Sequence, residues 1–385
     1  MKIASISHIG LRYTPGPEQR YGSAQAEINS REFSVVMVET DTGVQGIGEA
    51  RGPVSLLRAA VEFVSGAIVG HDVDEYAHIW ARTVSRCYHF AGDRLLMAAY
   101  SGVDIAIHDL LGRSRGVPVH TLLGAPAAGR EVVPYATSGW FTSDGLAGLE
   151  RQLQELPDGM AAVKVKIGRG PVDDEARMGL ARHILGPGAV LMADANANYT
   201  ADLALASMAR IRDCDIEWYE EPVPPWDLAG YRWLHDRAGM ALAAGEAHAG
   251  RSEFAALIGA NAVDVVQPNL CACGGFAAAS SVADLARAAN RRVVPAVWDS
   301  GIGLMAALHW VQSISPEAAS SSYPPRPRWI EYDVSPNPLR DELLIRPPQI
   351  VNGRIMSAEG PGLGVELNWD VVQRYTFLPQ QTWSG

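Results

Sequence analysis

The sequence predicts an α/β protein: a modified TIM (β/α) barrel with an α+β capping domain formed by the N-terminal region and the C-terminal tail. Eight short apolar runs alternate with helical stretches over residues 131–332, which is the order of repeated strand–helix units. The runs carry valine, isoleucine and alanine on both faces, as parallel strands covered by helices do. Four successive runs end in lysine or acidic residues, and such strand ends meet at one mouth of a barrel.

Residues 1–125 are expected to form the capping domain. Two β-rich runs, 2–10 and 31–40, come first, and a turn follows the second. Apolar residues at helical spacing then predict three helices. These helices are expected over residues 53–70, 73–90 and 93–116.

Residues 130–345 are expected to form the barrel, and residues 346–385 a C-terminal segment that packs back on the capping domain. The 385 residues are enough for both modules. The eight expected strands are 131–137, 161–168, 189–194, 215–220, 241–245, 263–269, 292–297 and 327–332. The helical stretches between them include 146–157, 174–185, 200–213, 228–239, 252–261 and 275–290.

The composition limits the possible partners. The chain has 32 Lys and Arg against 43 Asp and Glu, a net charge of −11, which argues against nucleic acid or an anionic membrane surface. An anionic substrate must therefore be attracted by a local cation. We find no signal peptide and no run of membrane-spanning length. The four cysteines favour a cytoplasmic protein without disulfides, and we expect a homo-oligomer.

Three carboxylates, Asp194, Glu220 and Glu246, stand 26 residues apart, and Lys164 and Lys166 lie on the strand before them. Taken singly, an acid at a strand end is often a helix N-cap, and two lysines on one strand face can be the solvated side. All these residues, however, end consecutive strands at the same mouth. The pattern therefore predicts one site.

The residue types in this set suit one chemistry. Three carboxylates on rigid strand ends form an oxygen-only site suited to Mg²⁺, with positions left for substrate oxygens. The cation can hold a substrate carboxylate and neutralise the charge that develops when the α-carbon loses its proton. Lys166 is then the expected base, and Lys164 the expected hydrogen-bond donor to a carboxylate oxygen.

Four short motifs give the chain a resemblance to a known family. They are KVK at 164–166, DAN at 194–196, EEP at 220–222 and GE at 245–246. Together they resemble the signature of the enolase superfamily, in its mandelate racemase/muconate lactonizing enzyme branch. Within that branch, GEAHAGR, QPNLCACGGF and VVPAVW look most like galactarolactone cycloisomerases and acid-sugar dehydratases. The resemblance covers nearly the whole chain, and it implies the barrel with its cap, Mg²⁺ and α-proton abstraction.

The chain departs from this family on the face opposite the lysines. Relatives of the racemase and dehydratase type carry an Asp on the sixth strand and a His on the seventh. Here Asn269 and Ala296 stand at the corresponding positions. One base is enough for a syn elimination, because Lys166 can take the α-proton and return a proton to the leaving oxygen on the same face. Asp299 is a candidate second acid, or alternatively a loop cap.

Six polar or aromatic residues near the strand ends are candidates for binding the substrate. For two of them another role is open: His248 can be a supporting hydrogen-bonder, and Glu331 a buried acid paired with Arg328. The six are Asn196, His248, Asn269, Trp298, Asp299 and Glu331. A turn-rich loop over residues 12–21 of the cap is also expected to contribute to specificity.

The expected function is Mg²⁺-dependent abstraction of the α-proton of a carboxylate through an enediolate, followed by β-elimination. A sugar-acid dehydratase and a sugar-lactone cycloisomerase both work in this way. One alternative is an epimerase or racemase that uses an unusual second acid such as Asp299. Another is a non-catalytic homologue that binds a metal and a carboxylate. The intact lysine pair argues against that last reading, and the missing opposite-face pair argues for it.

Overall fold

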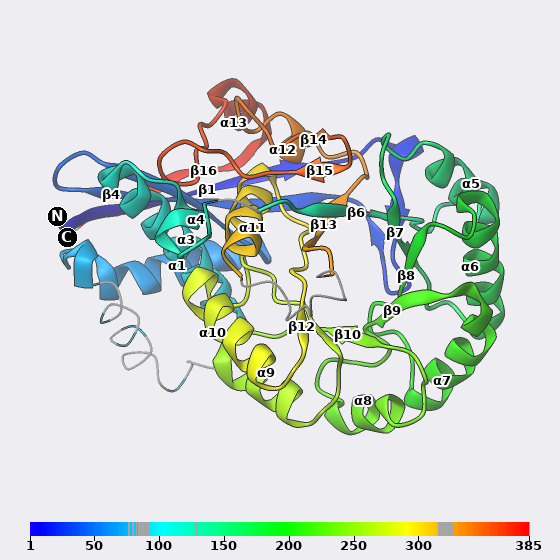
Figure 1. The fold of residues 1–385 in the computed structure, drawn as a ribbon. Coiled ribbons are helices and arrows are strands. Elements are labelled where there is room, and N and C mark those ends of the chain that lie inside the picture. The colour runs from blue at the N-terminus through cyan, green and yellow to red at the C-terminus, as the bar shows by residue number, and fades with distance from the viewer. Residues whose placement is uncertain are drawn as a thin grey trace.

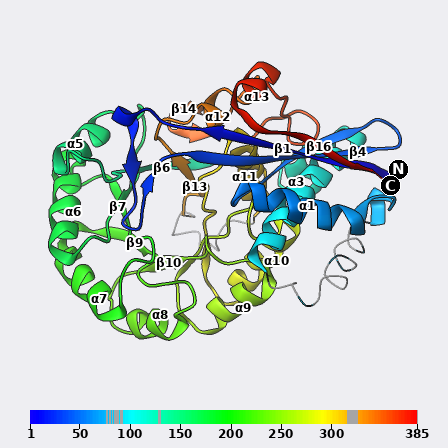
Figure 2. The ribbon, with the colours of Figure 1, turned by 180° about the vertical axis from the view of Figure 1, so that it is seen from behind.

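The computed structural model describes residues 1–75, 78, 81, 83, 89, 93–127, 130–314 and 326–384. A ring of helices surrounds a curled sheet, and a second, smaller sheet lies along one side of this ring (Figures 1 and 2). The helix expected over residues 73–90 falls largely outside the described residues. The fold class predicted from the sequence is confirmed.

The capping sheet has four antiparallel strands in the order β16-β1-β4-β5. Its strands are β1 (Ile3–Tyr13), β4 (Arg31–Thr40), β5 (Gln45–Ala50) and β16 (Thr376–Ser384). Between β1 and β4 lie the short helix η1 (Pro17–Gln19) and the hairpin of β2 (Tyr21–Gly22) and β3 (Glu27–Ile28). The helices of this part that lie in the described residues are α1 (Val54–Ile68), η2 (Val73–Glu75), α3 (Arg94–Arg115) and α4 (Val119–Leu122).

Helix α3 packs directly on β5 because two glycines of that strand leave room for it. A Cβ at Gly46 or Gly48 would lie 2.0 or 2.1 Å from a backbone oxygen of the helix. Asp93 caps the helix by accepting hydrogen bonds from the first free amides, and Gly116 ends it in the left-handed conformation. Both ends of α3 are thus determined locally, and the end at Gly116 is the one that the sequence predicted.

Helix α3 also corrects one expectation. We expected no run of membrane-spanning length, but α3 has 22 residues and contains an 18-residue window of mean hydropathy 1.3. Of that window, 89% is buried inside the structure. Core helices meet the same criteria of length and composition, so α3 is weak support for a membrane span.

The barrel has the eight expected parallel strands in the order β12-β11-β10-β9-β8-β7-β6-β13. They are β6 (Val133–Ser138), β7 (Ala162–Lys166), β8 (Val190–Asp194), β9 (Ile216–Glu220), β10 (Leu242–Ala244), β11 (Val265–Val266), β12 (Arg292–Val293) and β13 (Trp329–Asp333). The covering helices are α5 (Leu146–Gln154), α6 (Pro171–Leu185), α7 (Ala201–Arg210), η3 (Arg212–Cys214), α8 (Leu228–His235), α9 (Gly250–Gly259), α10 (Gly275–Ala288) and α11 (Gly301–Ser313).

The strand register brings the predicted functional residues to one level. Lys166 is paired with Asp194, and Asp194 with Glu220, across three neighbouring strands. On the far side of the barrel, the amide of Val297 donates to Glu331 Oε2 at 2.7 Å and so links the chain after β12 to β13. The C-terminal strand ends therefore face one shared mouth.

The C-terminal tail returns from the barrel to the capping sheet. Its elements are α12 (Pro338–Asp341), β14 (Ile350–Val351), β15 (Arg354–Ile355), α13 (Trp369–Tyr375) and β16. Strand β16 pairs with β1, so the two ends of the chain share one sheet (Figure 2). The domain limits at 125/130 and 345/346 stay a prediction.

A buried pair of histidines joins α4 to the barrel helix α11. The backbone N and Nδ1 of His120 lie 3.1 and 3.0 Å from Nδ1 of His309, whose Nε2 lies 3.1 Å from the carbonyl oxygen of Leu363. Because Nε2 must donate to that carbonyl, Nδ1 accepts and the ring is neutral. Burial accordingly lowers the pKa of His309 to about 3.

Candidate active site

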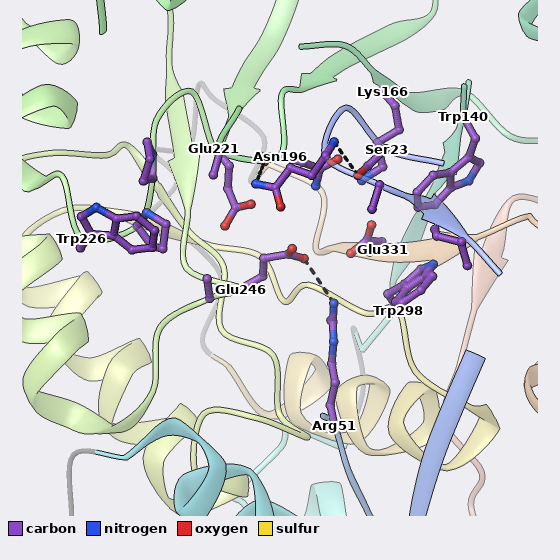
Figure 3. A pocket seen from close by; sticks show the side chains of 17 residues that line it. Ser23, Arg51, Trp140, Lys166, Asn196, Glu221, Trp226, Glu246, Trp298 and Glu331 are labelled. Carbon is purple, nitrogen blue, oxygen red and sulfur yellow. Dashed lines mark hydrogen bonds and ion pairs between the residues drawn. The ribbon is translucent and has the colours of Figure 1, made fainter. Parts of the chain in front are cut away.

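A cavity of about 450 Å³ opens at the C-terminal ends of the barrel strands, under the β2–β3 hairpin of the cap. Lys166, Glu246 and Glu331 enter it from three different strand ends, and Arg51 enters it from the cap (Figure 3). The remaining lining residues are Ser23, Gln25, Ala26, Ile28, Trp140, Asn196, Ala197, Glu221, Pro224, Pro225, Trp226, Ala247 and Trp298.

Lys166 is held at the cavity wall by a carboxylate and an aromatic ring. Its Nζ lies 2.5 Å from Asp194 Oδ2 and 4.6 Å from the centre of the Trp140 ring. Burial alone would raise the pKa of Asp194, but Lys166 and then Lys164 hold it below its ordinary value. Asp194 is thus a carboxylate, and its other oxygen accepts from the amide of Asn196 at 2.8 Å.

Lys164 lies deeper, beneath the cavity floor, and is only 1% exposed. Its Nζ is 2.5 Å from Glu220 Oε1, 2.9 Å from Glu331 Oε1 and 3.5 Å from Asp194 Oδ2. Burial alone lowers the pKa of this amine, but Glu220 and Glu331 outweigh burial and raise it well above its ordinary value. Lys164 is therefore a fixed positive charge in this network.

Glu220 is shared between the lysine and two neutral donors. Its Oε2 accepts from Gln267 Nε2 at 2.7 Å and from Trp218 Nε1 at 3.0 Å. Burial raises the pKa of Glu220 to about 7 despite the attraction of Lys164. Gln267, two residues before Asn269, thus contacts a predicted metal ligand.

The backbone at three strand ends is shaped for the site. Asn196, Ala197 and Glu221 all adopt positive φ angles, of 46°, 57° and 43°. Such angles cost free energy for residues with a Cβ and concentrate at functional sites. At Gly245, φ is +145° and a Cβ would lie 2.7 Å from Gln267 N, so only glycine fits there, next to Glu246.

The cavity gathers carboxylates that need a compensating charge. Glu221, which we did not predict, enters it beside Glu246, and one Glu221 oxygen is buried without a hydrogen-bond partner among the described residues. Burial, then Glu246 and Asp194, raises the pKa of Glu221 well above its ordinary value. Asn196 Oδ1 is likewise buried and unpartnered. A set of oxygen donors under mutual repulsion fits a hard divalent cation.

Another group of possible ligands is tighter but suits magnesium less well. Within the described residues, one set of three ligand atoms lies within 4.8 Å of one another, and it comes from Glu49, Cys271 and Asp299. Burial raises the pKa of the Cys271 thiol well above its ordinary value, which keeps it protonated. Glu49 already accepts hydrogen bonds from Ser300 and from the amide of Gly303, at the N-terminus of α11. This group fastens the cap to the barrel.

Three of the predicted substrate-binding residues are not among those that line the cavity. Asn269 Nδ2 donates to Asp299 Oδ2 at 2.8 Å and to Ala296 O at 3.0 Å. Asp299 lines a neighbouring cavity of about 270 Å³, behind Trp298. His248 is 4% exposed and packs on Phe254, and burial lowers its pKa to about 4. Their roles in substrate binding stay predictions.

Several lining residues were missed because they depend on tertiary contacts. Glu221 stands beside the predicted Glu220, and the EEP motif was the available signal. Arg51 follows a capping strand, and Trp226 lies in the loop after β9, where it is 77% exposed. The specificity loop was expected over residues 12–21, but the lining residues of that region begin at Ser23.

Two family models match the chain and agree with this fold. Residues 148–371 match the family described as Enolase C-terminal domain-like, and residues 17–124 match the Mandelate racemase / muconate lactonizing enzyme, N-terminal domain. The chain therefore belongs to the enolase superfamily, in its mandelate racemase/muconate lactonizing enzyme branch, as the motifs predicted.

Its relatives are enzymes, and so is this chain. It is 33% identical to D-galactarolactone cycloisomerase of Agrobacterium fabrum, over 92% of this chain and 94% of that protein. It is 26% identical to arabinonate dehydratase of Saccharolobus solfataricus, over 89% and 90% of the two chains. The crystal structure of the 3,6-anhydro-D-galactonate cycloisomerase from Zobellia galactanivorans superposes with a TM-score of 0.87 at 28% identity, covering 98% and 99% of the two chains.

Proposed function

We propose that this enzyme removes the α-proton of a sugar acid or sugar-acid lactone and then eliminates the β-oxygen, as a dehydratase or a cycloisomerase does. The observation that carries the proposal is the contrast between the two lysines. Lys166 reaches the cavity, whereas Lys164 is buried among three carboxylates. Only the first amine has access to a bound substrate, so Lys166 is the base and Lys164 supplies fixed positive charge.

The cofactor that suits this donor set is Mg²⁺, with Asp194, Glu220 and Glu246 as the proposed ligands and Glu221 beside them. When bound, it would hold the substrate carboxylate and stabilise the negative charge of the enediolate. The site's own acids support this assignment, because Glu221 and Glu246 face the same cavity without a matching cation for each. Among the described lining residues the one guanidinium is that of Arg51, whose Nη2 lies 3.9 Å from Glu246 Oε2.

The elimination needs a single base. Lys166 takes the α-proton, and the electron pair of that C–H bond passes into the enediolate. The enediolate then expels the β-oxygen as the C–O bond breaks, and the lysine returns its proton to the departing oxygen on the same face. From a hydroxy acid the departing group leaves as water; from a lactone it is a carboxyl group that stays in the same molecule, so the product is an isomer.

The epimerase alternative requires an acid on the opposite face, and Asp299 was its candidate. Asp299 lines a neighbouring cavity and is bonded to Asn269, with Trp298 facing the main cavity in front of it. The one-base elimination is therefore the better supported proposal.

The test is a panel of sugar acids and sugar-acid lactones incubated with enzyme and Mg²⁺ and followed by NMR. We expect elimination or isomerisation of at least one member, and a loss of about a thousandfold or more in Lys166→Ala. A matched control is Lys2→Ala, which removes an exposed lysine of the cap. Turnover that survives in Lys166→Ala contradicts the base assignment, and no turnover of any member contradicts the proposed function.

A further inference from the structure

Arg51 is a cavity-lining cation whose side chain makes no hydrogen bond to a described residue. Its closest charged contact is Glu246 Oε2, at 3.9 Å from Nη2, which is beyond hydrogen-bonding distance. Its Nη1 is buried and has no hydrogen-bond partner among the described residues. A guanidinium has five N–H donors, and a buried donor such as Nη1 costs free energy when it has no acceptor. Such an arrangement points to a ligand that supplies the acceptors.

The neighbouring arginine shows what a structural guanidinium looks like here. Arg31 is 1% exposed and donates to Asp333, to Ser335 and to the carbonyl oxygen of Trp298. Its ring contact with Trp298, at 4.1 Å, is also shorter than the 5.6 Å of Arg51. Both terminal nitrogens of Arg31 are thus used by the protein, although its Nε has no partner among the described residues. The side chain of Arg51, in contrast, makes no hydrogen bond to a described residue.

The position of Arg51 fixes which part of a substrate it can meet. It comes from the cap, at the end of β5, and its backbone N is anchored to Cys271 O at 2.8 Å. In Figure 3 its guanidinium enters the cavity from the side opposite Lys166. A substrate whose α-carbon lies at Lys166 therefore extends across the cavity, and the end of the substrate away from that carbon lies toward Arg51.

The charges of the site favour an anionic group at that far end. The net charge of the chain is −11, and Glu221, Glu246 and Glu331 all face the cavity. The described cations that line the cavity are Lys166 and Arg51, and Lys166 is already paired with Asp194 at 2.5 Å. A second substrate anion is therefore attracted most strongly beside Arg51. Arg51 also lines the neighbouring cavity, together with Arg31 and the acids Glu32, Glu49 and Asp299, so that second cavity adds no net positive charge.

We propose that Arg51 binds a second carboxyl function at the far end of the substrate, so that the substrate class is a dicarboxylic sugar acid or its lactone. In a free diacid this group is a carboxylate that accepts both prongs of the guanidinium. In a lactone it is the acyl group that becomes a carboxylate when the ring opens. This inference rests on the proposed function for the placement of the α-carbon at Lys166.

The test is a binding measurement with a matched pair of ligands, galactarate and galactonate, which differ at one end by a carboxylate against a primary alcohol. Calorimetric titrations in the presence of Mg²⁺ give the ratio of their dissociation constants. We expect wild-type enzyme to favour the diacid by about 10- to 100-fold, the range for a charge-assisted pair. In Arg51→Gln the ratio falls to threefold or less, and Arg51→Lys gives an intermediate ratio because it keeps the charge without the planar fork.

Arg169→Gln is the matched control, because it removes the same charge from an exposed arginine beside the cap hairpin, where Arg169 donates to Ser23 O. Its ratio stays at the wild-type value if the effect belongs to Arg51. A wild-type ratio near one, no measurable binding of either ligand, or a ratio unchanged in Arg51→Gln overturns the inference. Because the readout is binding, an absence of turnover contradicts the proposed function alone.

Discussion

Acidification is predicted to weaken the junction between cap and barrel through His309. The ring is fully buried, and its Nδ1 accepts hydrogen bonds from His120 while its Nε2 donates to Leu363 O. Burial lowers its pKa from 6.5 to about 3. A proton on Nδ1 would remove the acceptor that His120 needs, so the folded state resists protonation.

The magnitude follows from linkage. A histidine whose pKa is depressed in the folded state contributes stability that is present above pH 6.5 and is lost as the pH falls toward 3. At pH 5.0 the unfolded chain has taken up the proton and the folded chain has not. The loss at that pH is 1.5 pH units times 1.36 kcal/mol, or about 2 kcal/mol.

The assay is urea unfolding at pH 7.5 and pH 5.0, in wild type and in His309→Gln. Glutamine does not titrate, so the decrease in free energy of unfolding between the two pH values should be about 2 kcal/mol smaller in the variant. His183→Gln, which replaces an exposed histidine of α6, should keep the wild-type difference. An equal decrease in wild type and His309→Gln would refute the reasoning.

Three further outcomes are expected. Lys164→Met leaves buried carboxylates without their amine, so in a urea titration it should lower the free energy of unfolding by about 3–5 kcal/mol. Its control, Lys2→Met at the exposed N-terminus, should change that free energy by less than about 0.5 kcal/mol. Gly245→Ala should lower the free energy of unfolding by roughly 2 kcal/mol or more and weaken Mg²⁺ binding, because its Cβ would lie 2.7 Å from a backbone atom. Gly239 also has a positive φ but has open space around it, so Gly239→Ala should lower the free energy of unfolding by about 1 kcal/mol. Urea titration measures both changes, and calorimetry should find Mg²⁺ binding intact in Gly239→Ala. Mg²⁺ should raise the melting temperature of wild type, and at one hundred times its dissociation constant the added stability should be about 2.7 kcal/mol. Chelation of the metal should reverse this rise. If Glu246→Gln shows the same rise in melting temperature as wild type, the ligand assignment is contradicted.

The strands could be predicted from the sequence because each is a short run of apolar residues. The two lysines and three acids could be placed at the site because they stand at the ends of such runs. Short parallel strands with apolar faces recur at a regular interval along the sequence, and residues that close consecutive strands must share one mouth. The register that aligns Lys166, Asp194 and Glu220 is the direct consequence. These parts needed no knowledge of loops or of domain docking.

The other half of the cavity depends on long-range geometry that a linear pattern does not contain. Glu221 faces the cavity because its φ is 43°, an angle that its sequence neighbours do not demand. Arg51 reaches the cavity only because the capping strands dock over the barrel mouth. Asp299 was expected near the substrate from its position after the seventh strand; it lines the neighbouring cavity, whereas Trp298 lines both cavities. Side-chain direction at these ends is decided by tertiary packing.

The proposal that a single base works on one face of the substrate has a stereochemical test. A sugar acid that the enzyme processes is incubated with it and Mg²⁺ in D₂O, and the remaining substrate is analysed by NMR. With Lys166 alone, deuterium enters the α-position with retention of configuration, and no epimer forms. Formation of the epimer, with deuterium delivered to the opposite face, would contradict a one-base site and would require a second acid such as Asp299.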